Sequence, residues 1–366
     1  MKTTLVVGAG ATFADHKHSG YKSNRPPLDR NFFWYYREIA ENGVISHVRL
    51  FNKIEDYFKK YYGHSIRQKD SPYNSLEYVL RVLYVDAHVP AGADAAEKLL
   101  LGLIEHLNYV ISRSTNAITL NMRSKIVRLI DLALTKSDGR LSVISFNYDL
   151  QVERALLVLS NRKNYGNLLV FPACYCLPEN SYKFSKPKEK DADVFPVRHD
   201  NNPLKILKPH GSLNWWRVMP PGRSISHYYP READRFYISK RAMLPLDLTY
   251  RGNKTIPLLI PPLINKGIVL KSSVIGNIWR EMSTEITSSE KMIIYGYSMS
   301  DSDSEARSMF SHALKDGANI NSIEVINPDV SVGHKFFGMH HVKVGSIFRD
   351  VNNYISYYSS RNLTTG

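Results

Sequence analysis

Two side chains in this sequence combine catalytic chemistry with a suggestive setting, Asn147 and His210. Asn147 directly follows an apolar run that ends at Phe146. His210 lies between Pro209 and Gly211, and it is the only one of the 13 histidines framed in this way. A carboxamide can orient water or a hydroxyl group, and an imidazole can accept a proton near neutral pH. The pair is therefore suited to directing a hydroxyl group or water and removing its proton.

Two glycine-containing turns follow strand-like runs. Gly8-Ala9-Gly10 comes after residues 4–7, and Gly296-Tyr297-Ser298 comes after residues 292–295. The backbone N–H groups of such turns can hold a phosphate. The common dinucleotide fingerprint has a third glycine three residues further on, where this chain has Phe13, so an ordinary hydride-transfer enzyme is disfavoured. A simple tight turn between strand and helix is the alternative interpretation.

Polar or glycine motifs follow five predicted strands, and they begin at Gly8, Asn147, His210, Gly296 and Asn327. In an open parallel sheet, ligands bind outside the carboxyl ends of the strands, where the strand order reverses. We therefore expect the five motifs to converge on one crevice. Asp149 lies two residues beyond Asn147. Its carboxylate could belong to the same crevice or only cap the next helix, as Asp at such a position often does.

The elements that must position these motifs alternate between strand and helix. Residues 141–366 and the first 20 residues predict a Rossmann-like, mostly parallel sheet with helices on both faces, so the fold class is α/β. Residues 21–140 show helical periodicity and no strand, which predicts a large helical insertion, or lobe. Residues of about 161–260 form an irregular insertion within the sheet-bearing domain. The predicted strands are 4–7, 141–146, 168–171, 204–207, 256–260, 292–295, 323–326 and 342–344. The predicted helices are 31–40, 54–62, 74–85, 93–112, 124–134, 150–159, one from 272 onward, 304–314 and a last one.

Composition narrows the functional classes. The net charge of +14 favours a polyanionic partner such as nucleic acid or a nucleotide, although dispersed solubility charge explains it equally well. No run of about 18 apolar residues exists, which argues against a membrane span. The two cysteines, Cys174 and Cys176, cannot form a disulfide framework and suit a reducing cytosol. We predict that both are ordinary strand residues.

Six sequence blocks together resemble the sirtuin superfamily, and more closely the sirtuin-like domains of bacterial anti-phage defence systems. They occur in the family's order over nearly the whole chain. The blocks are GAGAT at 8–12, RPPLDRNFF at 25–33, SFNYD at 145–149, KPHGSLNW at 208–215, LIPPLINK at 259–266 and IIYGYSMSDSD at 293–303.

The resemblance implies NAD⁺ as a substrate rather than a retained cofactor, bound across the crevice. Asn147 and His210 match the catalytic asparagine and histidine of the family. Thr12 and the first glycine turn would lie by the pyrophosphate, Asp149 by the nicotinamide, and Asn327 by the adenosine ribose. The NAD⁺-binding residues implied in this way are Gly8, Ala9, Gly10, Ala11, Thr12, Phe146, Asp149, Gly296, Tyr297, Ser298 and Asn327.

Cleavage of the bond between nicotinamide and ribose passes through an oxocarbenium-like state, as in glycoside hydrolysis. Nicotinamide leaves from a cationic pyridinium, so no general acid is needed and no carboxylate pair is expected. The leading hypothesis is an NAD⁺ glycohydrolase that releases nicotinamide and ADP-ribose. The alternatives are a subunit that senses NAD⁺ or ADP-ribose without turnover and, less favoured, a nucleic-acid-processing subunit.

Protein-deacylating sirtuins hold a structural zinc with four cysteines, and a closed zinc site needs four ligands. This chain has two cysteines, so we expect no zinc and disfavour protein deacylation. A hydrolase that drains a shared cofactor must be restrained, and only about 20 residues follow the last predicted strand. We therefore expect a cytoplasmic effector of abortive infection, controlled in trans by homo-oligomerisation and by a partner such as a HerA-like ATPase or a short Argonaute. Any nucleic-acid contact would be indirect.

Overall fold

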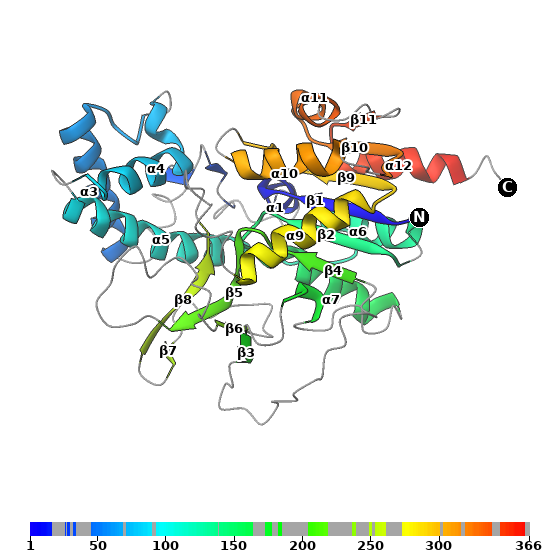
Figure 1. Ribbon diagram of the computed structural model, residues 1–366, viewed down its shortest axis with the longest axis horizontal. Coiled ribbons are helices and arrows are strands. Elements are labelled where there is room, and N and C mark those ends of the chain that lie inside the picture. The colour runs from blue at the N-terminus through cyan, green and yellow to red at the C-terminus, as the bar shows by residue number, and fades with distance from the viewer. Residues whose placement is uncertain are drawn as a thin grey trace.

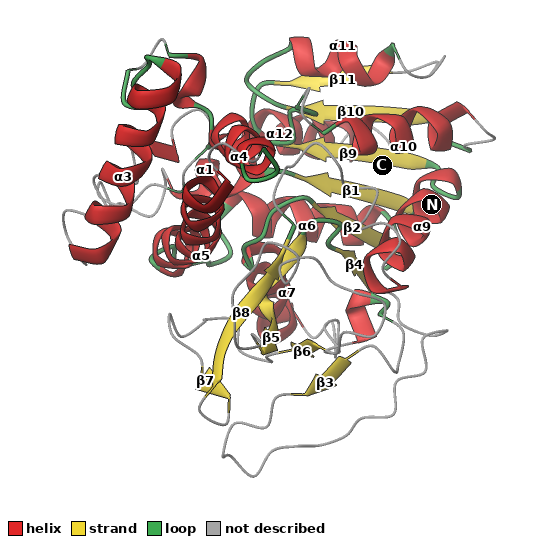
Figure 2. Cartoon of the chain, turned by 60° about the vertical axis from the view of Figure 1, so that its left-hand side comes forward, coloured by secondary structure: helices red, strands yellow, loops and turns green. Residues whose placement is uncertain are grey.

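A six-stranded, wholly parallel sheet organises the computed structural model of the protein (Figure 2). The strand order is β11-β10-β9-β1-β2-β4, so the order reverses between β1 and β9. These strands are β1 (Thr3–Val7), β2 (Leu141–Ser145), β4 (Leu204–Leu207), β9 (Lys291–Tyr295), β10 (Ser322–Ile326) and β11 (Gly345–Phe348). The structure describes residues 1–16, 26, 28–29, 32–33, 45–68, 71–89, 93–137, 139–163, 173–177, 182–184, 204–218, 236–238, 249–250, 253–260, 273–300, 303–315, 319–338 and 345–362.

Helices cover both faces of this sheet, which confirms the predicted fold class. Every residue of β1, β2 and β9 is buried, as expected for central strands of a parallel sheet that is covered on both sides. On one face α9 (Ser273–Thr287) packs against α10 (Ser304–Lys315). On the other, α6 (Lys125–Lys136) contacts both α7 (Gln151–Lys163) and α12 (Val351–Asn362). Two shorter helices, α1 (Ala9–His16) and α11 (Ser331–Phe337), follow β1 and β10.

A helical lobe stands beside the sheet (Figure 1). It contains α3 (Ile45–Tyr62), the 3-10 turn η2 (Pro72–Asn74), α4 (Leu76–Asp86) and α5 (Ala93–Asn116). These helices confirm the predicted periodicity, with α3 starting earlier and α5 ending later than expected. Among the described residues between 20 and 140 there is no strand. The domain boundary at residue 140 stays a prediction, and the buried side chains of α6 belong to the core of the sheet.

A second, smaller sheet is formed by described segments of the region that the sequence presented as irregular. Its order is β3-β6-β5-β8-β7, with β3 (Tyr182–Phe184), β5 (Gly211–Val218), β6 (Phe236–Ile238), β7 (Thr249–Tyr250) and β8 (Asn253–Leu259). The predicted strand at 256–260 is therefore the end of β8, which pairs antiparallel with β5 outside the main sheet. Strand β5 was not predicted. Two consecutive residues of β5 lie in separate cores. Trp215 belongs to the core of the main sheet and Trp216 to the core of the lobe.

Some predicted elements need correction. Cys174 and Cys176 are not strand residues, because Ala173–Tyr175 forms a 3-10 turn and Cys176 has a φ of 52°, which a strand cannot contain. Burial raises the pKa of both thiols, that of Cys176 to about 12. The predicted strands at 168–171 and 342–344, and most of the predicted helix at 31–40, lie outside the described residues. Helix α11 was not predicted, since it is only seven residues long.

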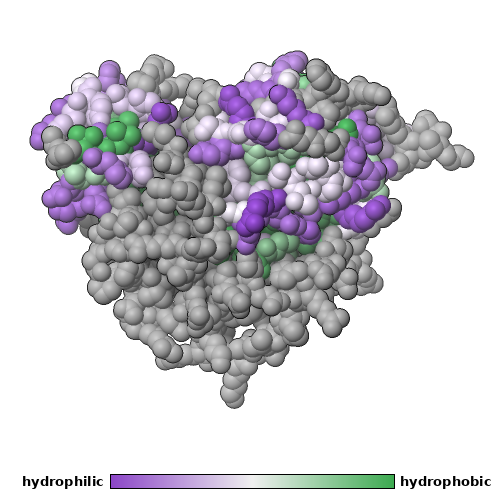
Figure 3. Space-filling view, in the orientation of Figure 1, coloured by the Kyte–Doolittle hydropathy of each residue, from purple (hydrophilic) through white to green (hydrophobic). Residues whose placement is uncertain are grey.

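The described surface of the lobe carries apolar residues beside its charged ones (Figure 3). Tyr61, Tyr78, Val85 and Val89 are between 39% and 48% exposed.

None of the helices in the described ranges combines the length and apolar character that crossing a membrane requires.

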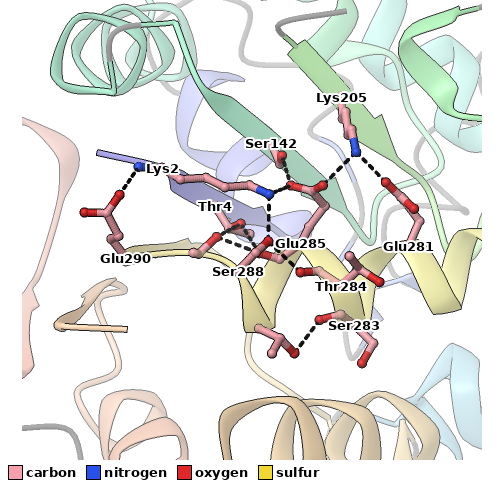
Figure 4. Close-up of polar contacts among 12 residues, drawn as sticks. Lys2, Thr4, Ser142, Lys205, Glu281, Ser283, Thr284, Glu285, Ser288 and Glu290 are labelled. Atoms are coloured by element: carbon pink, nitrogen blue, oxygen red, sulfur yellow. Dashed lines mark hydrogen bonds and ion pairs between the residues drawn. The ribbon is translucent and has the colours of Figure 1, made fainter. Parts of the chain in front are cut away.

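A charged network closes the amino-terminal end of the sheet (Figure 4). Glu285, in the last turn of α9, is the acceptor at its centre. Lys2 lies 2.9 Å and Lys205 2.8 Å from its carboxylate oxygens, and Ser142 donates a hydrogen bond to it. Burial works to raise the pKa of Glu285, but these donors outweigh that effect and hold it below its usual value. The network joins β1, β2 and β4 to α9.

Candidate functional site

The two glycine turns pack against each other at the carboxyl edge of the sheet. Gly10 N–H donates to Gly296 O at 3.0 Å, across the point where the strand order reverses. Gly296 has a φ of +61°, and a Cβ there would lie 2.3 Å from Ala11 N. A Cβ on Gly8 would lie 2.5 Å from Tyr297 Cα. Only glycine fits positions 8 and 296, because the two backbones touch.

The edge of this contact remains open. Ala9 and Ser298 are exposed, whereas Ala11 and Thr12 behind them are buried. The N–H of Ala11 donates to Gly8 O at 3.0 Å, which closes the turn into α1. The exposed residues at this edge, Ala9 and Ser298, have small side chains, which suits the close approach of a phosphate-bearing ligand.

Asn147 is fixed by its amide nitrogen. Its Nδ2 donates to Gly8 O at 3.0 Å and to Thr12 Oγ1 at 3.2 Å. Thr12 Oγ1 in turn donates to Asp149 Oδ2 at 2.8 Å. Since both donors of the amide face the first glycine turn, Oδ1 faces the other way, and no described residue donates to it. The arrangement holds a carbonyl oxygen ready for an external hydroxyl group or water.

Asp149 has the role that the sequence left as an alternative. Its Oδ1 accepts from Gln151 N at 3.0 Å at the start of α7, while Oδ2 is occupied by Thr12. Both carboxylate oxygens are therefore engaged within the protein. Asp149 caps α7 and orients Thr12, and through Thr12 it orients Asn147.

His210 is held by its own backbone and by aromatic neighbours. Its carbonyl accepts from Ile260 N at 2.8 Å, and Trp279 Nε1 donates to the preceding carbonyl, of Pro209, at 3.2 Å. Its ring packs edge-on against Phe146, with centroids 5.2 Å apart, and lies 6.4 Å from the ring of Trp279. The imidazole is therefore adjacent to the residue that precedes Asn147, which brings the two predicted catalytic loops side by side.

Gly211 gives the loop after β4 its sharp change of direction. It has a φ of +83°, and a Cβ there would lie 2.0 Å from Leu258 O on β8. The turn ends the parallel strand β4 and starts β5 of the second sheet directly after His210. A position with both a positive φ and a backbone neighbour can hold only glycine.

A buried ion pair holds the loop that carries His210. Lys208 and Glu153 are both fully buried, with Nζ and Oε1 3.2 Å apart. Lys208 also donates to the carbonyl of Asp149, so it joins the loops that carry Asn147 and His210. Tyr175 completes the pair by donating to Glu153 at 2.9 Å. A charge pair without water access holds only when its members are matched, which makes this a rigid joint between the loops.

Asp303 is a site residue that the sequence did not single out. It directly precedes α10, and its Oδ2 lies 3.5 Å from His210 Nε2. Tyr297 OH donates to the same oxygen at 3.0 Å, and the Tyr297 ring stacks on Phe146 with centroids 4.1 Å apart. The available signal was its place in the block at 293–303, which carried a predicted glycine turn but no role for the carboxylate. Trp279 gave no signal, because it follows the helical spacing of α9.

The structure joins most of the predicted site residues, with two exceptions. Asn327 lies at the same edge, beyond β10, but its Oδ1 accepts from Asp329 N at 3.0 Å in a local turn. Among the described contacts it makes none with the other site residues. The Ser298 side chain is exposed, and its carbonyl accepts from Lys335 Nζ at 3.3 Å. Within the described ranges, no three His, Cys, Asp or Glu side chains gather where they could hold a metal ion.

Comparisons with known proteins give similarities to solved structures alone. No protein-family model matches the chain, and no curated protein does. A structure described as Sir2 with a p53 peptide and NAD⁺ has 11% identity and a TM-score of 0.39, covering 99% of this chain and 93% of that one. A structure described as the structural basis of sirtuin substrate affinity has 12% identity and a TM-score of 0.38, covering 100% of this chain and 94% of that one.

A mutant Sir2 homologue in complex with ADP-ribose has 13% identity and a TM-score of 0.34, covering 98% of this chain and 93% of that one. Similarities of this size carry no argument about activity. The function must therefore be argued from the residues of the site.

Proposed function

We propose that the chain is an NAD⁺ glycohydrolase. It hydrolyses NAD⁺, so that NAD⁺ and water give nicotinamide, ADP-ribose and a proton. The observation that carries this proposal is the junction of two loops. A fixed carboxamide oxygen on Asn147 and the imidazole of His210 share one edge of the sheet, beside two glycine turns that touch. The motif resemblance supplies the substrate, and the geometry supplies groups suited to its hydrolysis.

In this proposal Asn147 Oδ1 accepts a hydrogen bond from the attacking water or from a ribose hydroxyl group. The bond between nicotinamide and the anomeric carbon breaks with its electron pair going to the pyridinium nitrogen, which neutralises the leaving group. Water forms the new bond to the anomeric carbon, and His210 accepts its proton and later releases it to solvent. Such a base contributes about two to four orders of magnitude to a rate.

The pyrophosphate would lie against the turn at 8–12, where Ala9 is exposed and α1 begins. The positive end of the α1 dipole favours an anion there, while the N–H groups of Gly8, Gly10 and Ala11 already donate to backbone carbonyls and hold the shape of the turn. The turn at 296–298 would face the adenosine part of NAD⁺, together with Asn327. Phe146 and Tyr297 would support the site through their stacked rings, since both side chains are buried.

The cellular role that fits this chemistry is that of an anti-phage effector that depletes NAD⁺ in the cytoplasm. Uncontrolled turnover would harm the cell that makes the enzyme, so we include in the proposal a homo-oligomer and a partner in trans. A HerA-like ATPase or a short Argonaute is the kind of partner that the motif resemblance suggests. The net charge of +14 suits docking to an acidic surface, or indirectly to nucleic acid.

The test measures, by liquid chromatography, the nicotinamide that purified protein releases from NAD⁺, both alone and with candidate partners. We expect Asn147→Ala and His210→Ala each to lower the rate about 100-fold or more. Asn352→Ala and His312→Ala are matched controls, because both residues are exposed on helices away from the site, and they should keep the full rate. Unchanged rates in the two site variants would refute the assignment. Recovery of intact, tightly bound NAD⁺ under every condition would instead identify a sensor.

A further inference from the structure

We propose that Asp303 positions the His210 imidazole and increases its affinity for a proton, with Tyr297 sharing the same carboxylate oxygen. Asp303 Oδ2 is placed between the two, 3.5 Å from His210 Nε2 and 3.0 Å from Tyr297 OH. The inference rests on the proposed role of His210 as the base. It adds a residue that acts through another side chain.

The fold holds this carboxylate in place from the backbone outwards. Met299 has a φ of 50°, and Asp303 N donates to Ser300 O at 3.0 Å, so the chain turns back before α10. Asp303 O then accepts from Arg307 N at 3.1 Å, which starts the helix. A carboxylate at the first turn of a helix is stabilised in its charged form. The Asp303 side chain is 5% exposed and that of His210 is 10% exposed, so water screens their interaction weakly.

At 3.5 Å the contact is within ion-pair distance but longer than a good hydrogen bond, so the carboxylate acts chiefly through its charge. It favours the tautomer with a proton on Nε2 and leaves Nδ1 as the basic nitrogen. When Nδ1 accepts a proton, the imidazolium forms beside an anion that is already in place. The arrangement lowers the energy of the step in which His210 takes the proton from water.

The other charged and titratable groups near this cluster come from the loops after β2 and β9 and from the helices α4 and α10. Tyr297 stays a neutral donor, because burial and the charge of Asp303 raise its pKa well above the usual value. Tyr148 also stays neutral, since burial raises its pKa, with Glu77 and Asp303 adding to the shift. Glu77, at the start of α4 in the lobe, accepts from Ser300 Oγ at 2.8 Å. Arg307 on α10 opposes these negative charges at Tyr297.

The imidazole resonances of the full-length protein in a pH titration by NMR provide the test. His210→Gln identifies the resonances of residue 210 by their loss. We expect Asp303→Asn to lower the titration midpoint of His210 by about one pH unit, because it removes a neighbouring opposite charge. Asn has nearly the same shape and keeps an oxygen that accepts from Tyr297 OH, so a purely structural role of Asp303 would leave the midpoint unchanged. Asp56→Asn removes a charge from the exposed surface of α3 and should shift nothing.

Tyr297→Phe is a second variant, and it should act in the opposite direction. Without the tyrosine donor, Oδ2 loses one hydrogen bond that competes with His210, so the midpoint should rise. An unchanged midpoint in either variant overturns the inference, and so does a fall of equal size in both, which would indicate a general disturbance of the site.

Activity gives an independent reading of the same residue. In Asp303→Asn, the acidic limb of kcat against pH should move down with the His210 midpoint, and plateau kcat should fall about tenfold with KM nearly unchanged. A change in KM with kcat retained would overturn the positioning role. If the wild-type protein releases no nicotinamide, the proposed function fails, while the NMR titration still decides whether Asp303 controls His210.

Discussion

The two ends of the parallel sheet use polar residues in opposite ways. At the amino-terminal end, the Glu285 carboxylate takes two lysines and a serine, so its bonding capacity is filled from within the protein (Figure 4). At the carboxyl end, the amide nitrogen of Asn147 is engaged, but no described residue donates to its oxygen. Complete pairing stabilises a fold, whereas a fixed group with unused bonding capacity is prepared for a ligand.

The backbone at the carboxyl edge contains turns that pack closely against other chain segments, whereas Gly139, before β2 at the other end, has a positive φ with open space around it. Positive φ angles occur at the carboxyl edge in Gly211, Gly296 and Met299, next to close contacts between turns. At the other end β1, β2 and β4 run in regular parallel register. The non-glycine residues with a positive φ are Met299, beside the candidate site, and Cys176, after the 3-10 turn at Ala173–Tyr175, so backbone strain is present at the site without being confined to it.

The largest expected effect breaks the amino-terminal network. Glu285→Ala should lower the free energy of unfolding by about 3–5 kcal/mol, because it leaves Lys205 and Lys2 without their shared buried partner. Glu281→Ala is the matched control, since its side chain is 31% exposed and shares Lys205, and it should cost less than about 1 kcal/mol. Chemical denaturation measures both. Equal losses of unfolding free energy in the two variants would contradict the view that burial makes the interactions of Glu285 stronger than those of Glu281.

The second effect concerns the contact between the glycine turns. Gly139→Ala is the control, because Gly139 has a φ of +76° and open space around it, and it should cost about 1–2 kcal/mol for backbone conformation alone. Gly296→Ala has the same conformational cost and also pushes Cβ toward Ala11 N, 2.3 Å away, which should add about 1–3 kcal/mol. Thermal unfolding and NAD⁺ affinity measure the difference. If the two variants lose equal stability and both bind NAD⁺, the turns are not in tight contact.

The smallest effect is a pair of opposite pH slopes. Asp15 accepts from Lys125 N at 2.5 Å and Ile126 N at 2.9 Å at the start of α6, but burial raises its pKa from 3.8 to about 6. Its protonated form is favoured in the fold, so its contribution of up to about 3 kcal/mol is complete below pH 3.8 and is lost as the pH rises through about 6.

Glu285 contributes with the opposite sign. Its lowered pKa means that stability is present above the unfolded-state value and lost as the pH falls through the folded-state value. We expect Asp15→Asn, which keeps an acceptor oxygen for α6, to remove the loss of stability between about pH 4 and 6. Unfolding free energies measured across that range provide the check. An unaltered slope in the variant would mean that another group titrates there.

Much of the fold was predictable because its signals are local. The parallel strands are continuous apolar runs, and the helices repeat their apolar residues at helical spacing, so their types follow from nearby residues. The second sheet was less visible, because β5 places Trp215 and Trp216 in two different cores and lacks a simple alternation. The turn at Cys174 and Cys176 depends on a positive φ at a residue that rarely adopts one.

The sequence by itself determined which chemical groups follow which strands, because strand ends, glycine turns and the side chains of Asn147 and His210 are set over a few residues. The tertiary structure decided their partners. Asp303 meets His210 across 93 positions of sequence, and Lys208 meets Glu153 across 55. Such pairings arise from how helices pack on a sheet, and no local pattern encodes the distance between two side chains that the fold brings together.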